Sequence, residues 1–153
     1  MMLSGETIRR REIIQPHRQR YNYDGVSGGE SLCGYDIRTL KRVVLWPIVT
    51  RLSVSIERFS MPKDVAGRVT DKSTWARLGV QVQNTIIEPG WCGWLTLELT
   101  YSPVSIWRPR LVISAGTPIA QVIFEPIDRV TSGYDGKYQF QPCRPVHAIF
   151  DQE

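Results

Sequence analysis

The sequence predicts an all-β fold, and two features of the chain lead to that prediction. From residue 43 onward, short apolar or alternating segments are separated by clusters of Gly, Pro, Asn, Asp and Ser, as expected for strands joined by turns. No helical period of useful length interrupts this series. Such a series is expected to form a sandwich, a barrel or a jelly roll.

The length of 153 residues suits one domain with a substantial core and is too short for two. We therefore treat residues 1–153 as a single domain. Residues 127–153 are rich in Gly, Asp, Gln and Pro and are predicted to form a flexible C-terminal tail.

One helix is predicted, over residues 4–14, where Ser4 can cap the first turn and Pro16 helps to end the element. Residues 21–34 contain four glycines and are predicted to be a loop.

Strands are predicted in the segments that follow. The residues of 52–57 alternate between apolar and polar, which predicts a half-buried strand. Shorter apolar segments predict the remaining strands, at residues 43–49, 111–114 and 119–124.

Composition limits the partners and cofactors. The net charge of +4 owes much to an arginine-rich start, which indicates either a nucleic acid or polyphosphate partner or simply a solvated helix face. We favour the solvated face, because aromatic residues do not interleave with these arginines, and expect no nucleic-acid partner. Three widely spaced cysteines, without CxxC or HxE motifs, predict neither disulfides nor zinc.

The chain has no run of about 20 apolar residues and no apolar stretch behind its basic N-terminus. We therefore expect a cytoplasmic protein without a membrane partner.

Glu98 lies on a predicted strand over residues 94–101. Period-two alternation places its side chain with Trp94, Thr96 and Thr100, opposite a leucine-rich face. From periodicity alone, the simpler interpretation is a solvent-facing glutamate. The functional alternative is a general acid or base whose pKa is raised by partial burial beside Trp94.

A second cluster consists of Lys72, Ser73 and Arg77, which stand close together in a turn. A guanidinium can clamp phosphate or orient a carboxylate, and a lysine suits phosphate as a point charge. A basic turn capped by serine is the simpler alternative.

Two further segments could contact a ligand. Glu88 precedes a Pro-Gly turn, where it can bind a sugar hydroxyl or a metal-nucleotide complex or can merely initiate the turn. The glycine-containing part of the tail carries Tyr134, Lys137 and Gln141. These side chains could fold over a bound triphosphate, or they could belong to a disordered terminus.

Taken together, these segments resemble the dCTP deaminase branch of the dUTPase-like superfamily. The resemblance rests on Lys72-Ser73-Thr74-Trp75-Ala76-Arg77, on Ile87-Glu88-Pro89-Gly90-Trp91 and on Leu95-Thr96-Leu97-Glu98. Weaker similarities, such as Gly34-Tyr35-Asp36-Ile37-Arg38, extend it over nearly the whole chain.

The resemblance implies zinc-independent deamination of dCTP to dUTP and ammonia. Glu98 would be the catalytic carboxylate, and Ser73 and Arg77 would position it and the attacking water. The implied nucleotide-binding residues are Lys72, Ser73, Arg77, Glu88, Thr96, Leu97, Tyr134, Lys137 and Gln141.

The resemblance also implies a distorted jelly roll that assembles as a homotrimer with sites between subunits. Mg²⁺ would be held by the triphosphate and not directly by protein groups. A dUTPase, a bifunctional dCTP deaminase/dUTPase and a non-catalytic nucleotide-binding protein remain alternatives, because Glu88 and Glu98 are acidic in each enzyme.

Overall fold

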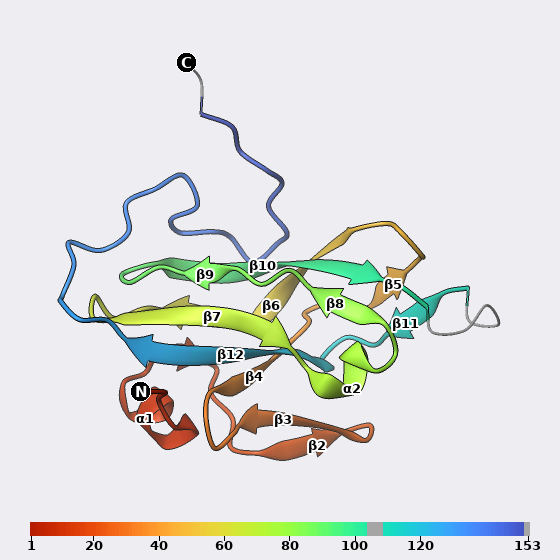
Figure 1. The fold of residues 1–153 in the computed structure, drawn as a ribbon, viewed down its shortest axis with the longest axis horizontal. Coiled ribbons are helices and arrows are strands. Elements are labelled where there is room, and N and C mark those ends of the chain that lie inside the picture. Colours follow the sequence, from red (N-terminus) through yellow and green to blue (C-terminus); the bar gives the residue numbers. More distant parts are fainter. Residues whose placement is uncertain (104–108, 152–153) are drawn as a thin grey trace.

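The computed structural model describes residues 1–103 and 109–151, and its described part is built almost entirely from strands (Figure 1). The described residues form twelve strands in two larger sheets and one small sheet. The all-β expectation is confirmed, and the arrangement is a distorted jelly roll.

The four-stranded sheet has the order β1-β6-β10-β8, and its strands are β1 (Ile14–Gln15), β6 (Arg51–Ser60), β10 (Cys92–Tyr101) and β8 (Val80–Val82). The six-stranded sheet has the order β2-β3-β4-β12-β7-β9, and its strands are β2 (Tyr21–Tyr23), β3 (Val26–Glu30), β4 (Tyr35–Arg38), β12 (Pro118–Pro126), β7 (Val65–Asp71) and β9 (Ile86–Ile87). The small sheet pairs β5 (Val43–Leu45) with β11 (Leu111–Ile113).

The core lies between the two larger sheets. Phe59 of β6 meets Phe124 of β12 with ring centroids 6.4 Å apart, and Trp91 packs on the other side of Phe59 at 6.1 Å. Both phenylalanines are fully buried. Burial of such aromatic surface joins the sheets, since each large ring contributes strongly to the hydrophobic driving force.

The N-terminal helix is shorter than predicted. Helix α1 spans Gly5–Arg10 and ends well before Pro16. Ser4 caps it as predicted, because its hydroxyl accepts a hydrogen bond from the Thr7 backbone N–H at 3.3 Å. A second, one-turn helix, α2 (Ser73–Ala76), was not predicted and begins directly after Lys72.

The loop predicted over residues 21–34 is wrong, because β2 and β3 form a hairpin there. Its glycines allow close approach of chain segments. A Cβ on Gly28 would lie 2.5 Å from Pro118 Cγ, and one on Gly29 would lie 2.4 Å from the carbonyl oxygen of Gln19. Glycine therefore marks tight packing here and not the absence of structure.

The alternation of β6 also differs from the prediction. Its polar residues Ser53, Ser55 and Glu57 are buried together with Val54, whereas Leu52 and Ile56 are only partly buried. The buried Glu57 is satisfied by Arg38, whose Nε and backbone N–H donate to its two carboxylate oxygens at 2.6 and 2.9 Å. A buried charge is tolerated when it is paired and hydrogen-bonded in this way.

The C-terminal tail continues from β12 and returns over β10 (Figure 1). The Gln141 carbonyl accepts from the Trp94 N–H at 3.1 Å, and the Phe140 N–H donates to the Cys92 carbonyl at 2.8 Å. These bonds attach the tail to the edge of β10. Among the described residues, no helix is long and apolar enough to span a bilayer.

Candidate active site

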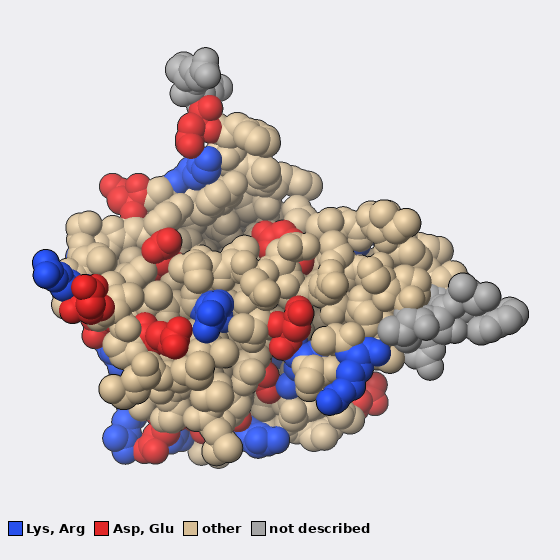
Figure 2. Space-filling model, in the orientation of Figure 1, with Lys and Arg blue, Asp and Glu red and all other residues tan. Residues whose placement is uncertain are grey.

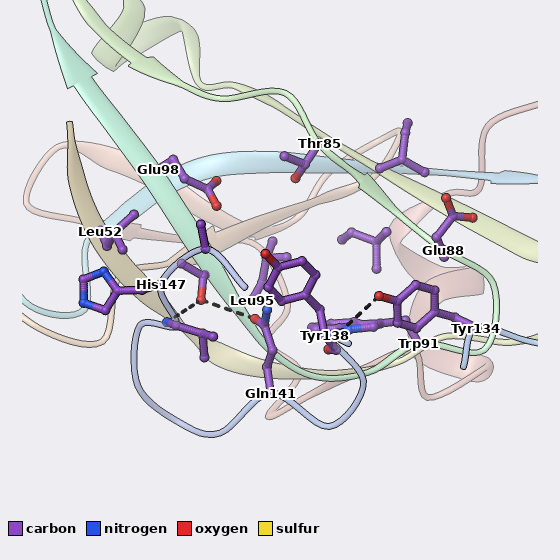
Figure 3. A pocket seen from close by; sticks show the side chains of 15 residues that line it. Leu52, Thr85, Glu88, Trp91, Leu95, Glu98, Tyr134, Tyr138, Gln141 and His147 are labelled. Carbon is purple, nitrogen blue, oxygen red and sulfur yellow. Dashed lines mark hydrogen bonds between the residues drawn. The ribbon is translucent and has the colours of Figure 1, made fainter. Parts of the chain in front are cut away.

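A pocket of about 360 Å³ opens beneath the C-terminal tail, and Figure 2 shows the surface hollowed at this place. Strands β6, β9 and β10 form its walls, together with the tail (Figure 3). The residues lining it are Leu52, Thr85, Ile86, Ile87, Glu88, Trp91, Leu95, Thr96, Glu98, Tyr134, Tyr138, Gln141, Val146, His147 and Ala148.

Strand β10 directs Thr96 and Glu98 into the pocket, as the period of two predicted. Leu95 also lines the pocket, although strict alternation would place it on the opposite face. The reason is a bulge: Trp94 pairs with Arg58 and Thr96 pairs with Val54, so the register of β10 against β6 shifts between them. A bulge twists a strand locally and redirects its side chains.

The carboxyl group of Glu98 is half-buried at one end of the pocket, and no described residue forms an ion pair with it. Burial raises the pKa of Glu98 above its ordinary value, and a hydrogen bond from its own backbone opposes this effect to a lesser degree. Burial disfavours the charged carboxylate, so the group takes up a proton more readily than a solvated glutamate. These properties suit a general acid or base.

The cause of this burial differs from the expected one. Trp94 is not among the residues that line the pocket, and its ring lies under the guanidinium of Arg58 at 5.6 Å. Leu52, which pairs with Glu98 across the sheet, and the tail residue His147 line the pocket with it (Figure 3). The solvent-facing glutamate that periodicity favoured is therefore not observed. Glu98 is half-buried, as in the functional alternative, but Trp94 does not line its pocket.

The opposite end of the pocket is aromatic. Trp91, Tyr134 and Tyr138 gather there beside Glu88 (Figure 3). The indole N–H of Trp91 donates to the Tyr138 carbonyl at 2.6 Å, and the Tyr138 N–H donates to the Tyr134 hydroxyl at 3.2 Å. Apolar walls with a few fixed polar groups are typical of small-molecule pockets.

Thr96 connects the tail to the pocket floor. Its hydroxyl accepts a hydrogen bond from the Val146 N–H at 3.0 Å and lies 3.3 Å from Gln141 Oε1 (Figure 3). The tail segment from Gln141 to Val146 is thereby held against the pocket.

A separate, more polar groove of about 260 Å³ lies beside the start of α2, and Lys72 and Ser73 line it together with Arg20, Asp36, Gln121 and others. The Lys72 ammonium is buried and donates to Asp36 Oδ2 at 2.8 Å and to the Ser27 hydroxyl at 3.3 Å. In Figure 1 the tail lies above β10, whereas α2 lies below β8.

Within one chain the structure thus separates the residues predicted to form the site. Five of them line the Glu98 pocket: Glu88, Thr96, Glu98, Tyr134 and Gln141. Lys72, Ser73 and Arg77 do not. Leu97 points into the core with 1% of its surface exposed, and the Lys137 ammonium is paired with Asp151 at 2.9 Å.

Sequence reasoning missed three notable residues. His147 and Tyr138 reach the pocket only because the tail folds back over β10, and no sequence spacing links them to Glu98. Arg20, which directly precedes β2, lines the groove with Lys72 and Ser73, although more than 50 residues separate it from them in the sequence. A lone histidine in a tail carries no signal of its own, so only the folded chain reveals it.

The described residues contain no group of three or more His, Cys, Asp or Glu side chains that could hold a metal ion. On the face shown in Figure 2, basic residues are interspersed with acidic ones.

Comparisons with known proteins identify the family. The profile of the dCTP deaminase-like family matches residues 3–127. A dCTP deaminase from Metallosphaera sedula is 33% identical over 144 residues, covering 92% of this chain and 75% of the relative. A dUMP-forming dCTP deaminase from Methanospirillum hungatei is 30% identical over 128 residues, covering 82% and 62%. Against other curated dCTP deaminases, such as that of Campylobacter lari, the chain spans about half of the relative, 48% in that case.

Solved structures agree on the fold. A dCTP deaminase from Agrobacterium tumefaciens gives a TM-score of 0.61 at 17% identity, covering 80% of this chain and 47% of that one. A dUTPase from phage phi11 of S. aureus, described with a structural Mg(II) ion, gives 0.57 at 18% identity, covering 82% and 93%. Given the match over residues 3–127, the chain belongs to the dCTP deaminase-like family.

Proposed function

We propose that the protein deaminates dCTP to dUTP and ammonia. The observation that carries this proposal is Glu98: a half-buried carboxyl group with a raised pKa, set in an apolar and aromatic pocket of a chain from this family. Two curated relatives, 33% identical over 144 residues and 30% identical over 128 residues, act on dCTP according to their names. As a soluble nucleotide enzyme it would act in the cytoplasm.

The chemistry assigns two proton transfers to Glu98. The carboxylate accepts a proton from a water molecule as the water oxygen forms a bond to C4 of cytosine and the electron pair of the C4–N3 double bond moves to N3. The resulting acid then donates that proton to the exocyclic amino group, the C4–N bond to this group breaks, and ammonia leaves as the C4–N3 double bond re-forms. Transfer of the remaining hydroxyl proton to N3 gives uracil. A raised pKa favours this role, because the group must be a base in one step and an acid in the next.

Ser73 and Arg77 complete the site from a neighbouring subunit in this proposal. A hydroxyl and a guanidinium can stabilise the charge that develops at the tetrahedral carbon and orient Glu98. Both lie outside the Glu98 pocket of their own chain, which supports a homotrimer in which each pocket meets the α2 region of the next copy. Exposed apolar side chains at Trp46, Ile48 and Val49 provide surface for such contacts.

The triphosphate is assigned to the groove at α2 and to the tail. Lys72 and Ser73 offer a cation and a hydroxyl, although the Lys72 ammonium is shared with Asp36. Tyr134, Lys137 and Gln141 would close over the phosphates from the tail. Mg²⁺, when bound, would neutralise and bridge phosphate oxygens, held by the nucleotide and not by a protein cluster.

Product analysis tests the proposal. The protein is incubated with dCTP and Mg²⁺, and the nucleotides are resolved by chromatography. Ammonia together with dUTP supports the deaminase. dUMP with pyrophosphate supports a bifunctional enzyme, which the dUMP-forming relative makes the second candidate. Consumption of dUTP alone indicates a dUTPase, and binding without turnover indicates a non-catalytic protein.

Mixing two inactive variants tests whether the site is shared between chains. Subunits carrying Glu98→Gln and subunits carrying Arg77→Ala are unfolded together, mixed in equal amounts and refolded. If each site takes Glu98 from one subunit and Arg77 from the next, random trimers recover about a quarter of wild-type activity. No recovery, with trimer formation confirmed by light scattering, would place both groups in one chain.

The activity is expected to fall on the acid side of the pH profile. Glu98 must be ionised to accept a proton from water, and its folded pKa is raised by burial. Turnover should therefore be lost as pH falls through a value above the ordinary glutamate pKa of about 4.3. The measurement is kcat/KM against pH, which reports groups of the free enzyme, and an acid limb at or below the ordinary value would contradict the assignment.

Removal of the tail is expected to affect ligand binding more than folding. A chain ending at Val130 loses Tyr134, Lys137 and Gln141 but keeps every assigned strand. Its thermal unfolding midpoint should change little, whereas the Kd for dCTP, measured by calorimetry, should rise by at least about tenfold as the phosphate contacts disappear. Loss of the cooperative transition would show that the tail is part of the core.

A further inference from the structure

The buried ion pair between Arg38 and Glu57 lies outside the pocket but is connected to it by hydrogen bonds. Glu57 is fully buried, and both the backbone N–H and the Nε of Arg38 donate to its carboxylate. The Glu57 backbone carbonyl accepts a hydrogen bond from the Ser55 hydroxyl at 2.6 Å. The same hydroxyl accepts from the Leu95 backbone N–H at 2.9 Å. The chain of contacts therefore crosses from β4 through β6 to β10.

These contacts coincide with the bulge. Val54 pairs with Thr96 and Arg58 pairs with Trp94, so three residues of β6 oppose the single residue Leu95. Within the bulge the Leu95 N–H has no regular backbone acceptor on β6, because the carbonyl that would accept its hydrogen bond in a regular sheet is displaced. The Ser55 side chain takes the place of that partner.

The bulge determines which side chains reach the pocket. Leu95 and Thr96 both line it, although neighbouring residues of a regular strand face opposite sides. Thr96 in turn holds the tail through Val146. Glu98 follows two residues later on the same strand, so its position along the pocket depends on the same register.

We propose that Ser55 is a positioning residue for the active site. Its hydroxyl fixes the β6 bulge and thereby sets the place of Thr96 and Glu98 in the pocket. The proposal extends the role of Glu98 described above and rests on the proposed function for its kinetic consequence. Its structural part, the dependence of the Leu95 backbone on Ser55, stands independently.

The test uses Ser55→Ala with Ser53→Ala as the matched control. Both serines are buried in β6, and both substitutions remove one hydroxyl. The Ser53 hydroxyl is bonded to Thr39 Oγ1 at 2.6 Å and not to β10. We expect Ser55→Ala to lower kcat for dCTP by about tenfold or more, with KM changed less than twofold, because a small displacement of a catalytic group is costly. Ser53→Ala should retain kcat within about twofold.

Amide hydrogen exchange provides a measurement that does not depend on activity. Exchange at the Leu95 N–H, followed by NMR, should accelerate by about tenfold in Ser55→Ala relative to Ser53→Ala. Equal Leu95 exchange in the two variants, or an equal loss of kcat in both, would overturn the proposal. If the wild-type protein turns over no pyrimidine triphosphate, the proposed function fails, and Leu95 exchange alone then decides whether Ser55 fixes the bulge.

Discussion

The Glu98→Gln variant is expected to lose turnover of dCTP by about 10²–10⁴-fold while it still binds the nucleotide. Glutamine keeps the size and hydrogen-bonding capacity of the side chain, but it can neither accept a proton from water nor deliver one to ammonia. The pocket walls, including Trp91 and Tyr134, are unchanged by the substitution. The measurements are single-turnover kinetics for the chemical step and calorimetry for the Kd.

The matched control is Glu88→Gln, at the other end of the same pocket (Figure 3). Glu88 is solvent-exposed and is assigned to nucleotide binding, so its loss should affect the Kd more than the rate of the chemical step. If Glu98→Gln retained near-wild-type turnover, Glu98 would not be the base, and another group in the pocket would have to supply the proton transfer.

The Glu57→Ala variant is expected to lose about 3–5 kcal/mol of free energy of unfolding. Glu57 is fully buried, and the substitution leaves the guanidinium of Arg38 in the core without its carboxylate partner. An uncompensated buried charge is costly because it has lost its water of hydration. Urea unfolding, followed by far-UV circular dichroism, measures the change.

The surface pair between Arg68 and Glu125 provides the control. Its charged groups are 3.6 Å apart, and each side chain is roughly half exposed. Glu125→Ala should cost at most about 1 kcal/mol, since exposed ion pairs contribute little. A similar small loss for Glu57→Ala would show that water reaches Arg38 in the folded protein and that the pair is not a structural requirement.

Much of the fold was predictable from local patterns in the sequence. The segments 111–114 and 119–124 correspond to β11 and β12, and the alternation around Glu98 corresponds to β10. These predictions succeed because side chains of a strand alternate between faces whatever the rest of the chain does. The cap at Ser4 was also predictable, because its hydrogen-bond partner is only three residues away in the sequence.

The errors occur where distant segments meet. Residues 21–34 contain a hairpin whose glycines allow close approach of β2, β12 and residues 18–19, a requirement that composition alone does not express. The polar face of β6 is buried because Arg38 from β4 satisfies Glu57, so the usual link between polarity and exposure is reversed.

The sequence by itself determined the fold class, the family and the acidic residue on the strand, because each depends on residue types at short spacings. Only the tertiary structure decided that Glu98 is half-buried, that the tail brings His147 and Tyr138 into its pocket, and that Ser73 and Arg77 lie outside this pocket. Burial and proximity depend on contacts between segments far apart in sequence, and those contacts exist only once the sheets have packed.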